Sequence, residues 1–239
     1  MHDRPRGTPL PQWRCVPFPQ DVQLAGYWSD LAPLDPSRDS PSLYTHFAGH
    51  DWLWDYLGSP PPDSEDTLRA MLAALDARKA QQPCLVIRRS YGSPALGYAC
   101  FWTVDTASGN IEIGNINLSP ALQRTPVATE AFSLMLAWAF GAGYRRVERK
   151  CNALNAPSRR AAQRLGFSYE GTFRNHMVVR GYSRDTAWFA MTDDDWARVG
   201  PAHAQWLAPA NFDAAGRQRA TLSGLTRPYL VALDPGQRG

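Results

Sequence analysis

The sequence predicts an α+β fold built around one large domain. Three observations support this prediction. Segment 111–118 alternates apolar and polar residues as a half-buried strand does, and segment 129–140 carries apolar residues at helical spacing. The third observation is segment 155–167, which has the start and stop signals of a short helix. Because strands and helices follow one another along the chain, we expect them to pack in layers around one sheet.

The N-terminal part of the chain contains an arm and then the first elements. Residues 1–19 include five prolines, which indicates an extended arm. A strand is expected at 22–27 and a short helical segment at 42–47. A longer helix is expected at 64–79, where apolar residues form one stripe after a Ser or Asp cap.

The central elements carry the clearest local signals. Asn155 follows a strand, and its side-chain oxygen can accept an N–H of the first turn of a helix. Gly166 supplies the left-handed residue that ends this helix. In order, the central elements are expected to be strands at 84–88, 95–102 and 111–118, a helix at 129–140, a strand at 145–151 and the helix after Asn155.

The C-terminal part is expected to begin with a hairpin. Segments 172–180 and 184–191 flank a Gly-Tyr-Ser sequence and should pair across it. A capped helix should follow at 193–198. The remaining residues are rich in Pro, Gly and Arg with aromatic anchors, and should pack on the core or on a second subunit. The chain is thus divided into an arm at 1–19, a domain at 20–198 and an appendage at 199–239.

Composition excludes several classes of protein. A net charge of +3 is too small to indicate nucleic-acid binding. The longest nearly apolar run, 131–140, is about half the length needed to cross a bilayer, and the N-terminus lacks the apolar core of a signal peptide. The four cysteines form no metal-type pair and no secreted disulfide framework. We therefore expect a cytoplasmic protein with reduced cysteines, no metal site, and no membrane or nucleic-acid partner.

The order of these elements resembles the GNAT superfamily of acyl-CoA-dependent N-acyltransferases. The resemblance covers residues 20–192 and is most specific at 110–190. It includes a strand, a loop that leads into a helix, a second strand, and the Asn-capped helix before Leu165-Gly-Phe167. The sequences Ala128-Thr-Glu-Ala131 and Tyr169-Glu-Gly171 look most like the branch that acetylates the N-termini of ribosomal proteins.

The resemblance implies a three-layer α/β arrangement with a mixed, mostly antiparallel central sheet flanked by helices. It also implies acetyl-CoA, or another acyl-CoA, as co-substrate and a primary amine as acceptor. The acceptor is either a protein N-terminus or a small molecule. Homodimerisation through the C-terminal segment is left open.

The coenzyme would bind at the loop before the helix at 129–140. In the family, backbone N–H groups of this loop hold the pyrophosphate at a helix N-terminus, which is favourable for an anion. Here Pro126 stands where glycine is usual and removes one N–H. A loop that no longer binds coenzyme A is the alternative interpretation. The resemblance assigns coenzyme contacts to Asn117, Leu118, Gln123, Arg124, Thr125, Val127, Ala128, Thr129, Asn155, Ser158, Arg159 and Arg160.

Acyl transfer to an amine needs a base, a donor for the carbonyl oxygen and a proton for the leaving thiolate. Glu112 is the predicted base, because it is the only charged residue in its strand and matches a catalytic position of many family members. A backbone N–H near Asn117 or Leu118 would stabilise the oxygen. Many members carry a Tyr acid where this chain has Ala162, so Ser158 is the predicted substitute.

The acceptor amine would enter opposite the coenzyme. Aromatic rings can stack on a cationic amine, and carboxylates can attract it. A Trp-rich helix that belongs to the core is the alternative interpretation. Acceptor contacts are predicted for Trp52, Trp54, Asp55, Tyr56 and His176. The predicted function is therefore N-acyl transfer. The competing hypotheses are a non-catalytic acyl-CoA sensor or interaction module, and a fold that has lost coenzyme binding.

Overall fold

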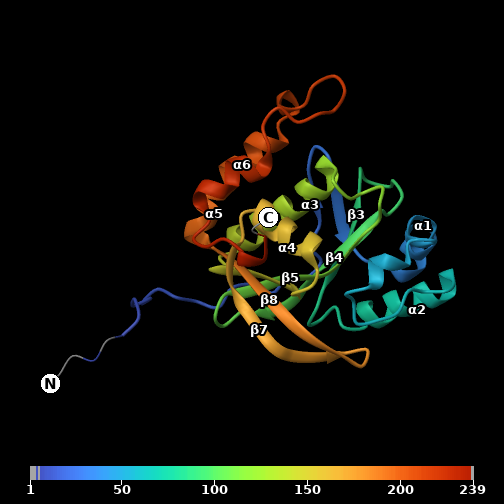
Figure 1. The fold of residues 1–239 in the computed structure, drawn as a ribbon, viewed down its shortest axis with the longest axis horizontal. Coiled ribbons are helices and arrows are strands. Elements are labelled where there is room, and N and C mark those ends of the chain that lie inside the picture. Colours follow the sequence, from blue (N-terminus) through green and yellow to red (C-terminus); the bar gives the residue numbers. More distant parts are fainter. Residues whose placement is uncertain (1–3, 5, 238–239) are drawn as a thin grey trace.

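The computed structural model describes residue 4 and residues 6–237. Within them an eight-stranded sheet has the order β1-β2-β3-β4-β5-β6-β8-β7 (Figure 1). The strands are β1 Leu24–Ala25, β2 Asp30–Pro33, β3 Cys84–Arg88, β4 Gly97–Asp105, β5 Asn110–Leu118, β6 Arg146–Asn152, β7 Ser168–Val179 and β8 Tyr182–Thr192. The helices are α1 Pro36–Phe47, α2 Glu65–Asp76, α3 Pro126–Gly141, α4 Ala156–Arg164, α5 Asp193–Leu207 and α6 Leu222–Thr226, with a 3₁₀ turn η1 at Asp51–Trp54.

All neighbouring strands pair antiparallel except β5 and β6, which are parallel. The predicted mixed, mostly antiparallel sheet in an α+β fold is therefore confirmed. Residues of α1 and α2 share one buried cluster with Val86, Tyr98 and Cys100 of the sheet. Residues of α3 and α5 share a second cluster with Ile111, Ile113 and other sheet residues. Helices thus cover both faces of the sheet, in three layers.

The local signals place most elements where they were expected. Asn155 caps α4 by accepting a hydrogen bond from the N–H of Ser158 at 3.0 Å. Gly166 has φ +92° and ends this helix, as its position indicated. The expectation missed β2 and the first half of α1. Asp35 caps α1 and Pro36 occupies its first position, so a Pro- and Asp-rich segment that looked like a turn is a helix start.

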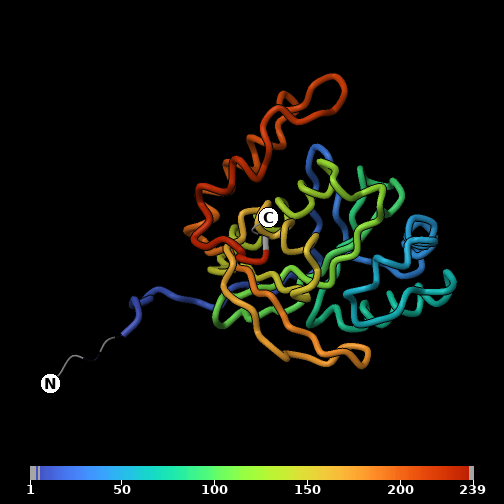
Figure 2. Tube along the Cα trace, in the orientation of Figure 1, coloured from blue at the N-terminus to red at the C-terminus, as the bar shows by residue number. Residues whose placement is uncertain are grey.

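The C-terminal residues belong to the body of the protein. Helix α5 runs continuously across the boundary expected at 198/199. Trp206 and Leu222 are buried in the same cluster as α3. The last described residues lie along α4 and β7, where the N–H of Tyr169 donates to the carbonyl of Ala232. Figure 2 shows the described N-terminal residues leading away from the body and the described C-terminal residues beside α4.

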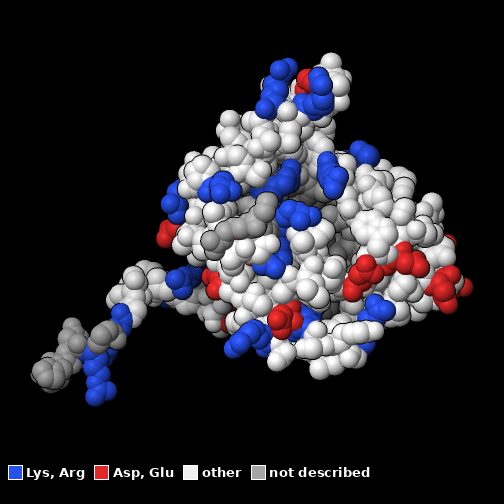
Figure 3. Space-filling view, viewed as in Figure 1, with Lys and Arg blue, Asp and Glu red and all other residues white. Residues whose placement is uncertain are grey.

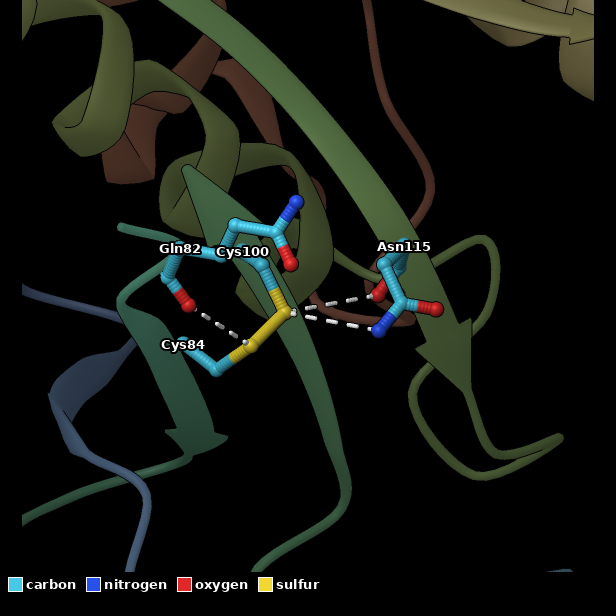
Figure 4. Close-up of a disulfide and its surroundings, with 4 residues drawn as sticks. All are labelled: Gln82, Cys84, Cys100 and Asn115. Atoms are coloured by element: carbon cyan, nitrogen blue, oxygen red, sulfur yellow. Dashed lines mark hydrogen bonds between the residues drawn. A yellow bond between two sulfur atoms is a disulfide. The ribbon is translucent and has the colours of Figure 1, made fainter. Parts of the chain in front are cut away.

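Two of the cysteines are joined, so the expectation of reduced cysteines is wrong for this pair. Cys84 of β3 lies directly opposite Cys100 of β4, with their Cα atoms 3.9 Å apart, and a disulfide links them (Figure 4). The pairing depends on the register of two strands, which spacing in the sequence does not reveal. Cys100 Sγ also contacts the side-chain amide and the carbonyl of Asn115 in β5. Cys15 and Cys151 are free.

His203 of α5 should make stability depend on pH. It is fully buried, and its Nε2 donates to the carbonyl of Leu165 at 2.9 Å. Burial lowers the pKa of His203 to about 4 from an ordinary 6.5. Between these values the unfolded chain binds a proton that the folded chain does not. The stabilisation is therefore present above pH 6.5 and is lost as the pH falls toward 4.

The expected loss is roughly 3 kcal/mol in the free energy of unfolding, because each pKa unit corresponds to about 1.4 kcal/mol. Urea unfolding of the wild type and of His203→Gln across this pH range measures it. Glutamine can still donate to Leu165 but does not titrate, so the variant should show a shallower pH dependence. Parallel curves for the two proteins would assign the acid sensitivity to other groups.

Candidate active site

The central feature of the site is the point where β5 and β6 stop pairing. Their parallel register covers only Asn110–Glu112 with Arg146–Glu148. Both strands continue, β5 to Leu118 and β6 to Asn152. We call residues 113–118 and 149–152 the fork. Because these two segments do not pair with each other, their facing backbone groups can hydrogen-bond an extended ligand.

The β5 arm of the fork is irregular. The register with β4 shifts between the pairs Tyr98–Asn117 and Cys100–Gly114, and Asn115 has φ +45°. Such a bulge leaves backbone groups unpaired and changes their direction. Asn117 is buried and Leu118 is partly buried. The predicted oxyanion donors therefore follow directly after a bulge.

The loop after β5 leads into the N-terminus of α3. Thr125 caps this helix by accepting from the N–H of Ala128 at 3.2 Å, and Pro126 occupies its first position. Proline is well suited to that position, because the first-turn N–H groups have no partner within the helix. Gln123 is held by its donation to the carbonyl of Leu118 at 2.9 Å. Arg124 is exposed, with φ +59°.

Helix α3 is thus intact despite Pro126, and it directs the N–H groups of its first turn, including that of Val127, out of its positive end. Val127, Ala128 and Thr129 are buried. The first-turn N–H groups at this end of α3 can bind an anion such as a phosphate group.

The N-terminus of α4 holds the next group of predicted coenzyme residues. The Asn155 side-chain oxygen is used for capping. Arg160 is exposed and takes part in none of the ion pairs found among the described residues. Arg159 is different, because it forms an ion pair with the buried Asp234 and donates to the carbonyl of Ala153. A phosphate could reach Arg159 only by competing with Asp234.

Ser158 and Cys151 lie together between α4 and β6. Burial raises the pKa of the Cys151 thiol, an effect that the Ser158 hydroxyl and nearby arginines partly offset. The thiol is therefore protonated near neutral pH and is a poor nucleophile. The hydroxyl of Ser158 accepts from Arg149 at 3.4 Å. Ser158, a residue of α4, is thus on the same side of the sheet as α3.

Glu112 lies on the opposite side of the sheet. Ile111 and Ile113 pack toward α3, so the residue between them faces away from it. The Glu112 side chain is 6% exposed, and its Oε2 accepts from Lys150 at 2.8 Å and from Thr103 at 2.8 Å. Lys150 also lies over the ring of Trp188, 4.2 Å from its centroid. The predicted base is therefore buried, forms an ion pair with Lys150 and lies next to the fork.

The predicted acceptor residues separate into two groups. Trp54 is buried against Phe47 and belongs to the core, as the alternative interpretation expected. Trp52 and Asp55 are exposed, and the Tyr56 hydroxyl donates to the carbonyl of Leu154 at 3.2 Å. The last contact joins the segment after η1 to the loop that follows β6.

His176 of β7 forms part of an aromatic cluster on the hairpin. Its Nδ1 is 3.0 Å from the Thr186 hydroxyl, and its ring meets the edges of Phe173 and Trp188. A pocket lies at Phe173, Arg174, Asn175 and His176. Since Trp188 contacts both His176 and Lys150, the hairpin cluster is connected to the carboxylate of Glu112.

Sequence reasoning missed Thr103, Lys150 and Arg149 as site residues. The sequence did contain one signal for these residues. Successive side chains of a strand point to opposite faces of the sheet, so residues 148 and 150 of β6 must lie on one face and residue 149 on the other. The strand register that sets Glu148 opposite Glu112 could not be derived from the sequence.

Surface charge is distributed unevenly. Figure 3 shows Lys and Arg side chains gathered on the face that carries α4, and acidic side chains at the end occupied by α1 and α2. Asp63, Glu65 and Asp66 lie at the start of α2. An anion is therefore favoured near α4 and a cation near α2.

The fold is the one that the resemblance implied. The sequence profile of the acetyltransferase (GNAT) domain matches residues 30–168, more than half of the chain. The protein therefore belongs to the GNAT acetyltransferase family. A comparison with curated proteins finds no match.

Solved structures agree with this assignment. A GCN5-related N-acetyltransferase from Brucella melitensis is 35% identical over 91% of this chain and 100% of its own, with a TM-score of 0.87. A protein described as a probable acetyltransferase of the GNAT family from Chromobacterium violaceum is 39% identical over 81% of this chain and 98% of its own, with a TM-score of 0.77. The Salmonella typhimurium enzyme that modifies the N-terminal serine of ribosomal protein L7/L12 shares the fold, at 19% identity over 70% of this chain and 96% of its own, with a TM-score of 0.61.

Within the part of the chain that the structure describes, no group of three or more His, Cys, Asp or Glu side chains is arranged to hold a metal ion. None of the described helices is both long enough and apolar enough to span a membrane.

Proposed function

We propose that this GNAT protein transfers an acyl group from a coenzyme A thioester to a primary amine. Acetyl-CoA is the donor that the family description suggests. The observation that carries the proposal is the fork, which has two helix N-termini on one side and a buried carboxylate on the other. Coenzyme and amine can therefore meet from opposite sides of the sheet.

The residues around the fork fit the parts of coenzyme A. The first-turn N–H groups of α3, with Arg124 and Thr129 beside them, are suited to the diphosphate. The unpaired β5 edge, including Asn117 and Leu118, is suited to the amides of the pantetheine arm. Asn155 would add a contact through its side-chain amide.

The reaction proposed here is direct transfer in a ternary complex. The amine nitrogen attacks the thioester carbonyl carbon, so an N–C bond forms and the C–S bond breaks. Glu112 accepts the amine proton, and a backbone N–H at Asn117 or Leu118 stabilises the carbonyl oxygen as it becomes negative. The thiolate then receives a proton, for which Ser158 is the proposed donor.

The acceptor is proposed to be a cationic amine in solution, either a protein N-terminus or a small molecule. Trp52, Asp55, Tyr56 and His176 are proposed to contact the acceptor, and the acidic end of the molecule that carries α1 and α2 favours a cation. The ribosomal substrate of the Salmonella protein motivates peptide N-termini as the first acceptors to test. Cytoplasmic location and a homodimer through residues 199–239 remain parts of the proposal.

Release of free coenzyme A thiol with a panel of peptides, polyamines and amino acids tests this function. The proposal expects thiol release that depends on both protein and amine, with an acylated product of the expected mass. Binding of coenzyme A without transfer to any amine in the panel would instead favour the sensor hypothesis.

A further inference from the structure

Arg149 of β6 is a buried cation that forms no ion pair among the described residues. The residue is 6% exposed. Its guanidinium donates to Ser158 Oγ at 3.4 Å and lies 5.2 Å from the centroid of the Phe132 ring. Its Nε and one terminal nitrogen have no hydrogen-bond partner in the part of the chain that the structure describes. Burial is the main cause that lowers its pKa.

Arg88 is as buried as Arg149 but pairs with Asp39, whose side chain is 1% exposed. The partly buried Arg159 likewise pairs with Asp234, whereas the partly buried Arg164 and Arg184 form no ion pair among the described residues. A buried charge without a partner costs several kcal/mol, so folded proteins seldom retain one unless a ligand uses it. The free donors of Arg149 therefore indicate that an anion binds there.

The position of Arg149 limits which anion this is. It follows Glu148, the last residue of β6 that pairs with β5, and so it lies at the apex of the fork. Its contacts with Phe132 of α3 and Ser158 of α4 set it on the coenzyme side. Phe132 is six residues beyond the first residue of α3, or about 9 Å along the helix from its N-terminus. An anion at Arg149 is thus deeper in the site than a diphosphate at the helix end.

We propose that Arg149 determines the acyl donor by pairing with a carboxylate at the far end of the acyl chain. This inference rests on the proposed function. The preferred donor is then the coenzyme A monothioester of a short dicarboxylic acid, such as succinyl-CoA, and the product is an N-acylated amine that carries a free carboxylate. Arginine is suited to this role, because its planar guanidinium binds a carboxylate through two parallel hydrogen bonds.

The bond changes are those of the transfer described above: the amine N–C bond forms, the thioester C–S bond breaks, and the distal carboxylate is unchanged. Arg149 touches the substrate and determines specificity. It takes no proton. The other anionic source with the same chemistry is the diphosphate of the coenzyme itself, and the experiment must distinguish the two.

The test compares acetyl-CoA, succinyl-CoA and glutaryl-CoA as donors for the wild type and Arg149→Met, with free coenzyme A as a binding probe. The wild type should use succinyl-CoA or glutaryl-CoA at least about 10-fold better than acetyl-CoA by kcat/KM. Arg149→Met should lower the ratio of kcat/KM for that donor to kcat/KM for acetyl-CoA by about 10–100-fold, as expected for loss of a charge-assisted pair. The Kd of free coenzyme A should be unchanged.

Arg145→Met is the matched control, because Arg145 is exposed and precedes the same strand. It should leave the ratio between donors unchanged. Methionine at 149 removes an unneutralised charge, so thermal unfolding should occur at the same or a higher temperature. The donor preference of the wild type tests the inference even if a variant folds poorly.

Two results would overturn the inference while the proposed function stands. One is a wild type that prefers acetyl-CoA. The other is an Arg149→Met variant that binds all three thioesters and free coenzyme A more weakly by the same factor, which would assign Arg149 to the diphosphate. Absence of binding and turnover with every coenzyme A compound would instead overturn the proposed function itself.

Discussion

Replacement of Glu112 with glutamine is expected to lower kcat/KM by about 100–10,000-fold, the range typical for loss of a general base. Glutamine has nearly the same shape and can still accept a hydrogen bond from Thr103, but it cannot take the proton of the attacking amine. The KM for the acyl donor should change little, because Glu112 lies on the side of the sheet away from α3 and α4. Steady-state kinetics with a saturating amine measure both quantities.

Glu148→Gln is the matched control for this variant. Glu148 lies directly opposite Glu112 in the register, and its carboxylate is 3.5 Å from the same Lys150 amine. It therefore shares the charge environment of Glu112 but lies on β6, where we assign no chemistry to it. Its replacement should lower kcat/KM by no more than about fivefold, which corresponds to a change of about 1 kcal/mol in the activation free energy. A Glu112→Gln enzyme as active as the wild type at every pH would rule out the base assignment.

Replacement of Glu130 with alanine is expected to destabilise the fold by about 3–5 kcal/mol. This buried carboxylate of α3 accepts hydrogen bonds from the backbone N–H groups of Tyr27, Trp28 and Ser29, and from the Ser29 hydroxyl. Alanine would leave these donors without partners, and each buried unsatisfied donor costs about 1–3 kcal/mol. Chemical unfolding of the wild type and the variant measures the difference.

Glu170→Ala is the control for Glu130→Ala. Glu170 is exposed, although its hydrogen bonds with Arg146 hold the pKa of that carboxyl below its usual range. An exposed ion pair contributes at most about 1 kcal/mol, so this change should be small. Equal destabilisation by the two variants would show that the turn between β1 and β2 does not depend on the Glu130 carboxylate.

The sequence was informative about the fold where the signal is local. Asn155 and Gly166 mark the two ends of α4 through backbone geometry that few other residues provide. The limits of β3 follow from a continuous apolar run bounded by turn residues. In contrast, β2 is four residues long and contains Asp30 and Pro33, so its strand character depends on pairing with β3.

The site was less predictable, because its geometry depends on contacts between distant residues. Glu112 could be singled out as a lone charge in an apolar strand, but its partner Lys150 is brought to it by the parallel register of β5 and β6. The sequence indicated that Arg159 is an exposed arginine of a helix. In the structure it forms an ion pair with Asp234, which is 75 residues away in the sequence. The disulfide between Cys84 and Cys100 likewise follows from strand register.

Calorimetric titration of the protein with acetyl-CoA, succinyl-CoA and free coenzyme A tests the central claim most directly. The claim is that the N-terminus of α3 and the fork form a coenzyme A site even with Pro126 in the loop. We predict micromolar binding of free coenzyme A and of at least one thioester. No heat of binding with any of the three at millimolar ligand would contradict the account and leave only the fold.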